Sequence, residues 1–339
     1  MSSNAKAGVK TYPLYINGLG KNWSIRSSYI GSNAYRLPEE VDLNQLPATT
    51  TPYNPALRPF KDWGRLLTVS NIAFANYQAW ETQVNHRFGA GLSLQGTYTL
   101  AKNLSDANGD APLRYAGEAG FATGPGAAGP VGIADRFNLR SMRGNDPGTR
   151  RNRALISMLY QLPFGRGQRF MRNANAFVNG VLGDWQVSTI ALAESGPFMT
   201  ATISPSLSQS NLNEAGHGIP VRPDQIGNCN LPHPTPQDWF NAAAFVPTPA
   251  GAGRVGNAKV GSCVGPRTVA VAGGLSKNFI LSEKTKLRFD ATFTNLLNHP
   301  NFAAPSTAFG TPAFGVTNTV QAQENAGNRV GQLSLRVDF

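Results

Sequence analysis

Residues 330–339 read VGQLSLRVDF. Successive side chains of an extended chain point to opposite faces, so this stretch has one apolar and one polar face. By itself it would equally suit an edge strand of a soluble protein. The same pattern recurs upstream in segments of about ten residues, the length of a strand that crosses a bilayer at a tilt. We therefore predict membrane-crossing strands, the last of which has Leu333, Leu335, Val337 and Phe339 on its apolar face and Gln332, Ser334, Arg336 and Asp338 on its polar face.

The clearest hairpin pairs residues 80–88 with residues 92–100. One of its faces is too polar for the core of a sandwich, and the other is too completely apolar to face solvent. This combination predicts a barrel wall between lipid and a polar lumen. Further strands are expected at 8–17, 22–30, 153–162, 185–195, 269–279 and 286–297, with a short one at 314–320. The candidate lumen-facing residues are Glu81, Gln83, Asn85, Arg87, Gln95, Arg288, Asp290 and Arg336.

The connections between these strands alternate between short and long. Outer-membrane barrels have short periplasmic turns and long extracellular loops. Counted back from a periplasmic carboxy-terminus, every long connection falls outside the cell and every short one inside. The expected extracellular loops are 32–76, 102–152, 197–267 and 298–329.

The composition excludes several classes of protein. Charged residues make up 14% of the 339 residues, and no apolar run is long enough for a transmembrane helix. The formal net charge of +11 raises the possibility of nucleic-acid binding, but the arginines are spread along the chain without a nucleic-acid fold motif. Lipopolysaccharide phosphates around the loops, or a merely solvated surface, explain the charge as well. The first twenty residues lack the apolar core of a secretory signal, and we expect the chain to begin within a longer protein.

No motif indicates catalysis, a metal or a cofactor. GPGAAG (124–129) matches a dinucleotide-binding pattern but lacks the strand before it and the helix after it. DANGDA (106–111) has calcium-loop spacing without the turn glycine or the final glutamate. The four histidines are far apart and show no ligand spacing. We therefore predict that the chain is not an enzyme and that it binds no cofactor, no metal and no nucleic acid.

The chain resembles the carboxy-terminal barrel of TonB-dependent outer-membrane receptors, in particular the Oar-like group with a carboxypeptidase-regulatory-like domain. The similar stretches follow the order of that family along nearly the whole chain. Two positions depart from it: Leu100 stands where the family has Trp, and GTRRNR (148–153) where it is more acidic. The stretches are NWSIRSSYIGSNAYRLP (22–38), NYQAWETQVNHRFGAGLSLQGTYTLAKNLSD (76–106), ADRFNLRS (134–141), YQLPFGRGQRF (160–170), LGDWQVSTIALAESGPF (182–198), DWFNAAAF (238–245), FTNLLNHPNF (293–302) and the terminal strand.

The resemblance implies a bacterial outer-membrane barrel of about 22 strands, plugged by an amino-terminal domain and energised through TonB. Residues 1–339 would then be its carboxy-terminal part, an all-β, antiparallel transmembrane segment of about nine strands, without the plug and the first strands. The implied partners are outer-membrane lipid and lipopolysaccharide, TonB acting through the missing plug, and an unidentified small ligand, glycan or peptide. The barrel-assembly machinery would read Leu333, Leu335, Val337 and Phe339.

Two other functions fit the pattern: a passive porin or adhesin-like barrel, and a soluble secreted β-protein that binds glycans or carries a hydrolase site. Cys229 and Cys263 lie in one expected extracellular loop, and passage through the periplasm allows their oxidation. We expect them to form a disulfide, with two unpaired thiols as the alternative. About nine strands cannot close a large barrel, so we expect a curved open sheet with its loops collapsed over one end.

Overall fold

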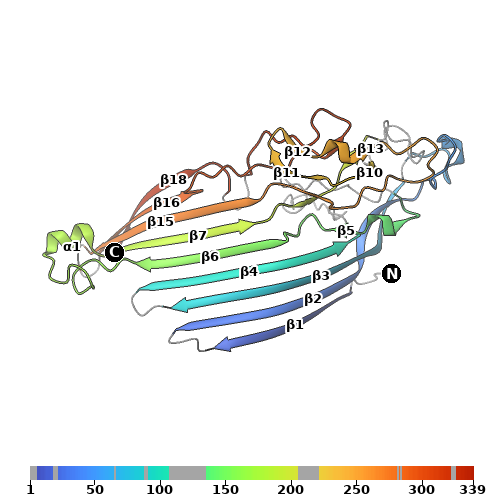
Figure 1. Ribbon diagram of the computed structural model, residues 1–339. Helices are drawn as coiled ribbons and strands as arrows, with labels where there is room; N and C mark the ends of the chain where they lie inside the picture. Colours follow the sequence, from blue (N-terminus) through green and yellow to red (C-terminus); the bar gives the residue numbers. More distant parts are fainter. Residues whose placement is uncertain are drawn as a thin grey trace.

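The computed structural model describes residues 6–17, 22–64, 66–87, 91–106, 135–204, 221–280, 282, 285–321 and 326–339. Its main feature is a 10-stranded sheet, drawn in Figure 1, in which the strands follow one another in chain order. Every pairing in this sheet is antiparallel. Its strands are β1 (Lys6–Asn17), β2 (Trp23–Asp42), β3 (Leu67–Arg87), β4 (Leu92–Ser105), β5 (Gly144–Asn145), β6 (Asn152–Gln161), β7 (Trp185–Glu194), β15 (Thr268–Ile280), β16 (Lys286–Thr294) and β18 (Val330–Asp338).

The pairing register places like side chains on the same face. Leu335 lies opposite Phe289, and Arg336 lies opposite Arg288. Opposed arginines repel each other, but each is paired with a carboxylate two residues further along its own strand. The Nε of Arg288 lies 2.9 Å from Asp290 Oδ2, and the Nε of Arg336 lies 2.7 Å from Asp338 Oδ1. The predicted separation into an apolar and a polar face is therefore present in the observed register.

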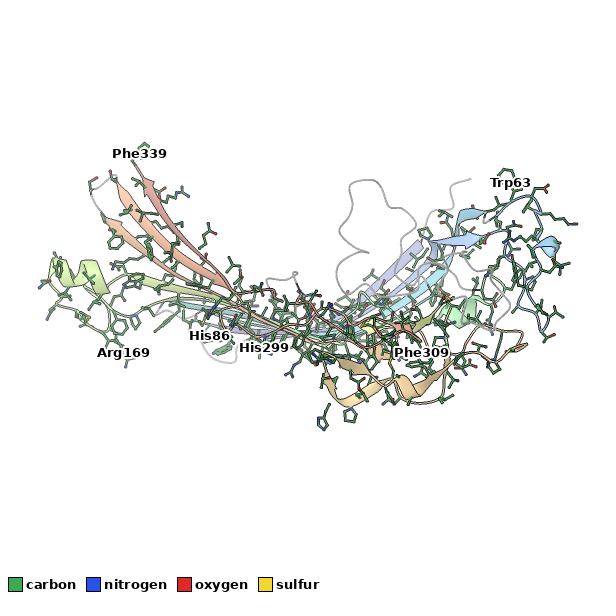
Figure 2. All side chains as sticks on the ribbon, turned by 90° about the horizontal axis from the view of Figure 1, so that it is seen from above. Trp63, His86, Arg169, His299, Phe309 and Phe339 are labelled. Atoms are coloured by element: carbon green, nitrogen blue, oxygen red, sulfur yellow. A yellow bond between two sulfur atoms is a disulfide. The ribbon has the colours of Figure 1, made fainter. Side chains whose placement is uncertain are left out.

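The sheet is open. Among the described strands, β1 pairs only with β2 and β18 pairs only with β16. Figure 2 shows the sheet as a single curved layer, with Phe339 and Arg169 toward one end and Trp63 and Phe309 toward the other. This arrangement confirms the expectation of a curved open sheet.

The long connections lie together at the end of the sheet opposite the carboxy-terminus (Figure 1). The first predicted loop, 32–76, is wrong in its bounds, because β2 and β3 extend for 20 and 21 residues and leave only 43–66 between them. Pro38 suggested a break in the strand, but it lies where the register shifts between Tyr35 and Pro38. A proline is tolerated at such an irregularity.

Two other predicted bounds also need correction. The strand expected at 286–297 ends at Thr294. The short strand expected at 314–320 does not form, because Phe314 and Val320 make only isolated bridges, to Ser306 and Phe302 respectively. Both segments lie in a connection whose backbone is held by individual hydrogen bonds rather than by a ladder.

The long connections fold onto one another as a unit that we call the loop cap, made of the described parts of 135–151, 195–267 and 295–329. The sheet is one layer thick, so most fully buried apolar side chains belong to the cap. Its short strands form two-stranded pairs: β8 (Phe198–Met199) with β14 (Cys263–Val264), β9 (Thr202–Ile203) with β17 (Ala308–Phe309), β10 (Asp224–Gln225) with β13 (Phe245–Val246), and β11 (Asn230–Thr235) with β12 (Asp238–Phe240). The larger of its clusters contains Met199, Ala201, Cys229, Phe240, Ala244, Phe245, Ala258, Cys263 and Phe314.

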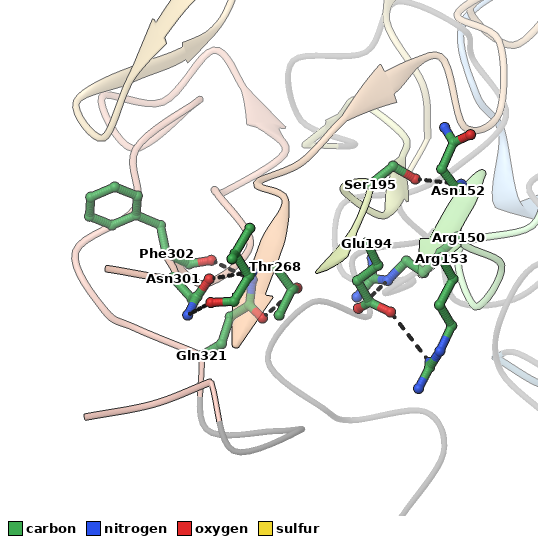
Figure 3. A network of polar contacts seen from close by, with 10 residues as sticks. Arg150, Asn152, Arg153, Glu194, Ser195, Thr268, Asn301, Phe302 and Gln321 are labelled. Carbon is green, nitrogen blue, oxygen red and sulfur yellow. Dashed lines mark hydrogen bonds and ion pairs between the residues drawn. The ribbon is translucent and has the colours of Figure 1, made fainter. Parts of the chain in front are cut away.

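Polar contacts attach the cap to the sheet (Figure 3). Asn301 accepts a 2.7 Å hydrogen bond from the amide of Val269 and donates one of 2.9 Å to its carbonyl. The Thr268 hydroxyl donates to Gln321 Oε1 over 2.8 Å. Glu194, buried at the end of β7, forms an ion pair at 3.2 Å with Arg150 and another at 3.3 Å with Arg153. The cap is therefore fixed to the ends of β6, β7 and β15.

Helical structure in the described ranges consists of short segments. The helix α1 (Ala176–Leu182) lies in the connection 162–184, and its amino-terminus is capped by Asn175, whose side chain accepts from the amide of Val178 at 2.8 Å. Three 3-10 turns, η1 (Pro55–Leu57), η2 (Leu139–Met142) and η3 (Ala242–Ala244), lie in the long connections. Within the described ranges, no helix has the length and apolar character that a membrane span needs.

Candidate functional site

The predicted lumen-facing residues lie on the polar face of the sheet but do not converge on one point. Gln83 lies opposite Arg26 on β2 and Thr97 on β4. Glu81 and Asn85 lie two residues before and after Gln83 on β3, and therefore on the same face of the sheet. Asn85 lies opposite Gln95. Arg288, Asp290 and Arg336 share the face near the other edge of the sheet, five or six strands from β3 along the path. Arg87 is paired with Ser93 in the register, and its side chain lies outside the described residues.

A shallow depression of about 320 Å³ crosses the middle of this sheet. Most of its lining belongs to the polar face and consists of small side chains, such as Ser157, Ser188 and Thr292. No titratable side chain lines it. Its surface is largely apolar and has no groups for acid, base or nucleophilic chemistry.

A second, larger cavity of about 710 Å³ lies where β4 meets the loop cap. One wall is the end of β4, a second is the segment around η2 and β5, and a third is the cap segment 253–262 together with Arg222. We call it the basic cavity, because one acidic residue, Asp135, lines it beside six basic ones. The basic residues are Lys102, Arg140, Arg143, Arg222, Arg254 and Lys259.

Arg222 is the buried member of this set. The residue is 3% exposed, and its Nη1 donates a 2.8 Å hydrogen bond to the carbonyl of Ala258. Its Nε is buried and makes no hydrogen bond within the part of the chain that the structure describes. Burial lowers the pKa of the guanidinium to about 10, because removing the cation from water disfavours its charged form. The cavity therefore contains a desolvated positive charge that no carboxylate of the described residues pairs with.

The charge of Arg254 is neutralised by the carboxylate of Asp224. Its two terminal nitrogens contact the two oxygens of Asp224 at 2.6 and 2.8 Å, and the amide of Asn257 donates to Asp224 at 2.9 Å. These hydrogen bonds lower the pKa of the Asp224 carboxyl and raise that of Arg254. A bidentate pair of this kind positions a loop and leaves little charge for a ligand.

The other cations surround the cavity. Lys102, Arg140 and Lys259 are exposed, and no carboxylate of the described chain forms an ion pair with them. The Arg143 guanidinium lies 4.8 Å from the centre of the Phe74 ring, a cation–π contact that leaves its charge unneutralised. Asp135 carries the one negative charge, and its Oδ1 accepts the amide hydrogen of Phe137 at 2.9 Å. The arrangement suits an anion.

Sequence reasoning noted the density of arginines around residues 136–153 but did not find this cavity. Arg222 and Lys259 come from another connection, 69 or more residues beyond that stretch. No motif links them to Lys102 or Arg140, so no local signal could have found the group.

Cys229 and Cys263 form a disulfide with a Cα–Cα distance of 5.3 Å. Both are fully buried in the larger apolar cluster of the cap. Neither cysteine contacts the basic cavity directly, but β14, which contains Cys263, follows its lining segment at once. The disulfide therefore holds one wall of the cavity to β11 and β12.

On the terminal strand, Leu333, Leu335, Val337 and Phe339 are all exposed and have no apolar layer over them. The segments 107–111 and 124–129, and His217, lie outside the described residues. Within the described part, no group of three or more His, Cys, Asp or Glu is placed to bind a metal.

Comparisons with known proteins found a matching family model and a similar solved structure. A family model described as "Outer membrane beta barrel domain" matches residues 17–332, almost the whole chain. One similar solved structure is the crystal structure of the outer membrane transporter YddB from Escherichia coli, at 8% identity and a TM-score of 0.46. That match covers 98% of this chain and 32% of the other, so the chain spans about a third of its length. No curated protein matches the chain.

Proposed function

This chain belongs to the outer membrane β-barrel family, and we propose that it is the carboxy-terminal wall of a receptor that takes up a ligand using energy passed through TonB. Its place is the outer membrane. The missing part of the receptor would be an amino-terminal plug and about a dozen further strands. The chain itself would contribute the wall and a cap of extracellular loops.

The open sheet is the observation that carries this proposal. Its edge strands β1 and β18 each have one partner among the described strands. A bilayer tolerates no open sheet edge, because an unpaired backbone group in lipid costs several kcal/mol. Nine long strands in one curved layer therefore suit an arc of a larger barrel, and the largest common barrels of this membrane are the plugged transporters.

The two faces support the same orientation. The apolar set on β18 would face lipid, and the set that includes Glu81, Gln83, Arg288 and Arg336 would line the lumen. An arc of a wide barrel leaves room for these long charged side chains beside a plug. Closing the same strands into a small barrel would crowd them together in its interior.

The proposed role is not enzymatic, and it requires no cofactor or metal. Loop-borne contacts would select the ligand, which could be a small molecule, a glycan or a peptide. Leu333, Leu335, Val337 and Phe339 would be read by the barrel-assembly machinery during insertion.

Two measurements on the intact protein test this proposal. Formaldehyde cross-linking in cells should trap the intact receptor with TonB, and the product should disappear in a strain that lacks TonB. In planar bilayers the purified protein should show no stable open-channel current, because a plug fills the lumen. A large steady conductance without TonB cross-linking would instead identify a passive porin.

A further inference from the structure

We propose that the basic cavity binds a phosphate group, with Arg222 as the buried anchor and Lys102, Arg140, Arg143 and Lys259 as the surrounding cations. The phosphate belongs to a headgroup of the outer leaflet, such as that of lipopolysaccharide. This inference does not depend on TonB. It rests on the outward orientation proposed above for the apolar face of the sheet.

Arg222 is the first reason. A buried cation with an unsatisfied N–H is costly unless an anion or acceptor meets it. Its Nη1 already donates to Ala258, while its Nε has no partner among the described residues. A phosphate in the adjoining cavity would supply the missing counter-charge for this guanidinium.

The charge balance is the second reason. With Arg254 neutralised by Asp224, five positive side chains face the single carboxylate of Asp135. Most of these cations are exposed at the cavity mouth, so they can attract an anion from outside and then share its oxygens. Arg222 is only 3% exposed, and no carboxylate of the described residues pairs with it. An arginine of a merely solvated surface would instead be exposed to water.

The position of the cavity decides the source of the phosphate. Lys102 and Leu104 line it, and both fall on the apolar face of β4, in step with Leu92 and Leu100. Lys102 lies ten residues beyond Leu92 on β4, which corresponds to about 34 Å along a strand and about 26 Å along the membrane normal at a tilt of about 40°. The apolar band of such a barrel is about 25 Å tall. The cavity thus lies at the depth of the outer headgroups, where basic pockets bind anionic lipid.

The test compares lipid and soluble phosphate on the intact receptor purified in detergent. The probes are lipopolysaccharide with a phosphorylated lipid A, the same material after enzymatic dephosphorylation, and inorganic phosphate. We expect saturable binding of the phosphorylated lipopolysaccharide. The dephosphorylated form should bind roughly 10–100-fold more weakly, because it cannot make the charge-assisted hydrogen bonds of the phosphate.

Three variants locate the binding. Arg222→Gln should weaken it by roughly 10–100-fold, and Lys102→Gln, an exposed change that leaves the cap core untouched, by about 3–10-fold. Arg267→Gln removes an exposed arginine that does not line the cavity and serves as the matched control, with unchanged affinity expected. Protection of the Cys229–Cys263 disulfide from reductant reports whether each variant retains a folded cap.

The outcomes separate the alternatives. Equal binding by Arg222→Gln, Lys102→Gln and the unaltered protein would overturn the site. Equal binding of phosphorylated and dephosphorylated lipopolysaccharide would overturn the claim that the bound group is a phosphate. Saturable binding of inorganic phosphate alone, lost in Arg222→Gln, would support the anion site and overturn its lipid source. A receptor that fails to cross-link to TonB but passes these tests would refute the proposed function and leave this inference standing.

Discussion

Removing the Cys229–Cys263 disulfide should loosen the loop cap and leave the sheet intact. The bond joins β14 to the segment that precedes β11, across a sequence separation of 34 residues. Both cysteines lie in the apolar cluster formed around Phe240, Phe245 and Phe314. Replacing both with alanine removes the covalent constraint without placing a hydroxyl group in that cluster.

The magnitude follows from loop-closure entropy. A cross-link over about 34 residues restricts the unfolded cap by about 12.6 cal/mol/K, or about 3.8 kcal/mol at 25 °C. Because each 1.4 kcal/mol is a factor of ten, the opening equilibrium of the cap should rise by roughly 10²–10³-fold. If the cap is less stable than this, it should open completely.

Amide hydrogen exchange on the intact protein in detergent measures the effect by region. We expect protection in 221–264 to fall by that factor in the double alanine variant, while the amides of β4, β6 and β7 exchange as before. A fall of less than tenfold in the cap would refute the entropic reasoning. An equal loss of protection in the strands would show that cap and sheet unfold as one unit.

Three further predictions concern sidedness, assembly and pH. An impermeant maleimide on whole cells should label a cysteine at Gln237 and not one at Ser282, because the long and short connections lie on opposite sides of the membrane; the reverse pattern would invert the topology. Deleting Phe339 should lower the outer-membrane level of the intact receptor several-fold in quantitative immunoblots, and an unchanged level would reduce that residue to ordinary lipid-facing surface. Because the hydrogen bond from Arg254 lowers the pKa of Asp224, the pair stabilises the cap above the ordinary aspartate pKa and loses that contribution as the pH falls through the lowered value. Amide protection of the cap should therefore decline below about pH 4. In Asp224→Asn the cap should be less protected at neutral pH, and its protection should change less as the pH falls; identical pH profiles for the variant and the unaltered protein would contradict this account.

Most of the main sheet could be predicted from the sequence because its signal is local. Side chains alternate strictly along an extended chain, so residues such as Leu333 and Arg336 are assigned to opposite faces without knowledge of their partners. The lengths of the connections then predict the side of the membrane for each loop. The same local reasoning placed the ends of β2 and β3 wrongly, because prolines and blurred alternation at 32–42 hid strands that are held together by their mutual pairing.

The loop cap and its basic cavity were decided by the tertiary structure alone. Arg222, Arg254 and Lys259 meet Lys102 and Arg140 only because aromatic and small side chains distant in sequence pack into one cluster beside the disulfide. Whether an arginine is solvated, paired like Arg254 or buried without a carboxylate like Arg222 depends on neighbours that no periodic pattern specifies. Period-two alternation is a property of the backbone and can be read along the chain, whereas desolvation and charge pairing are properties of three-dimensional packing.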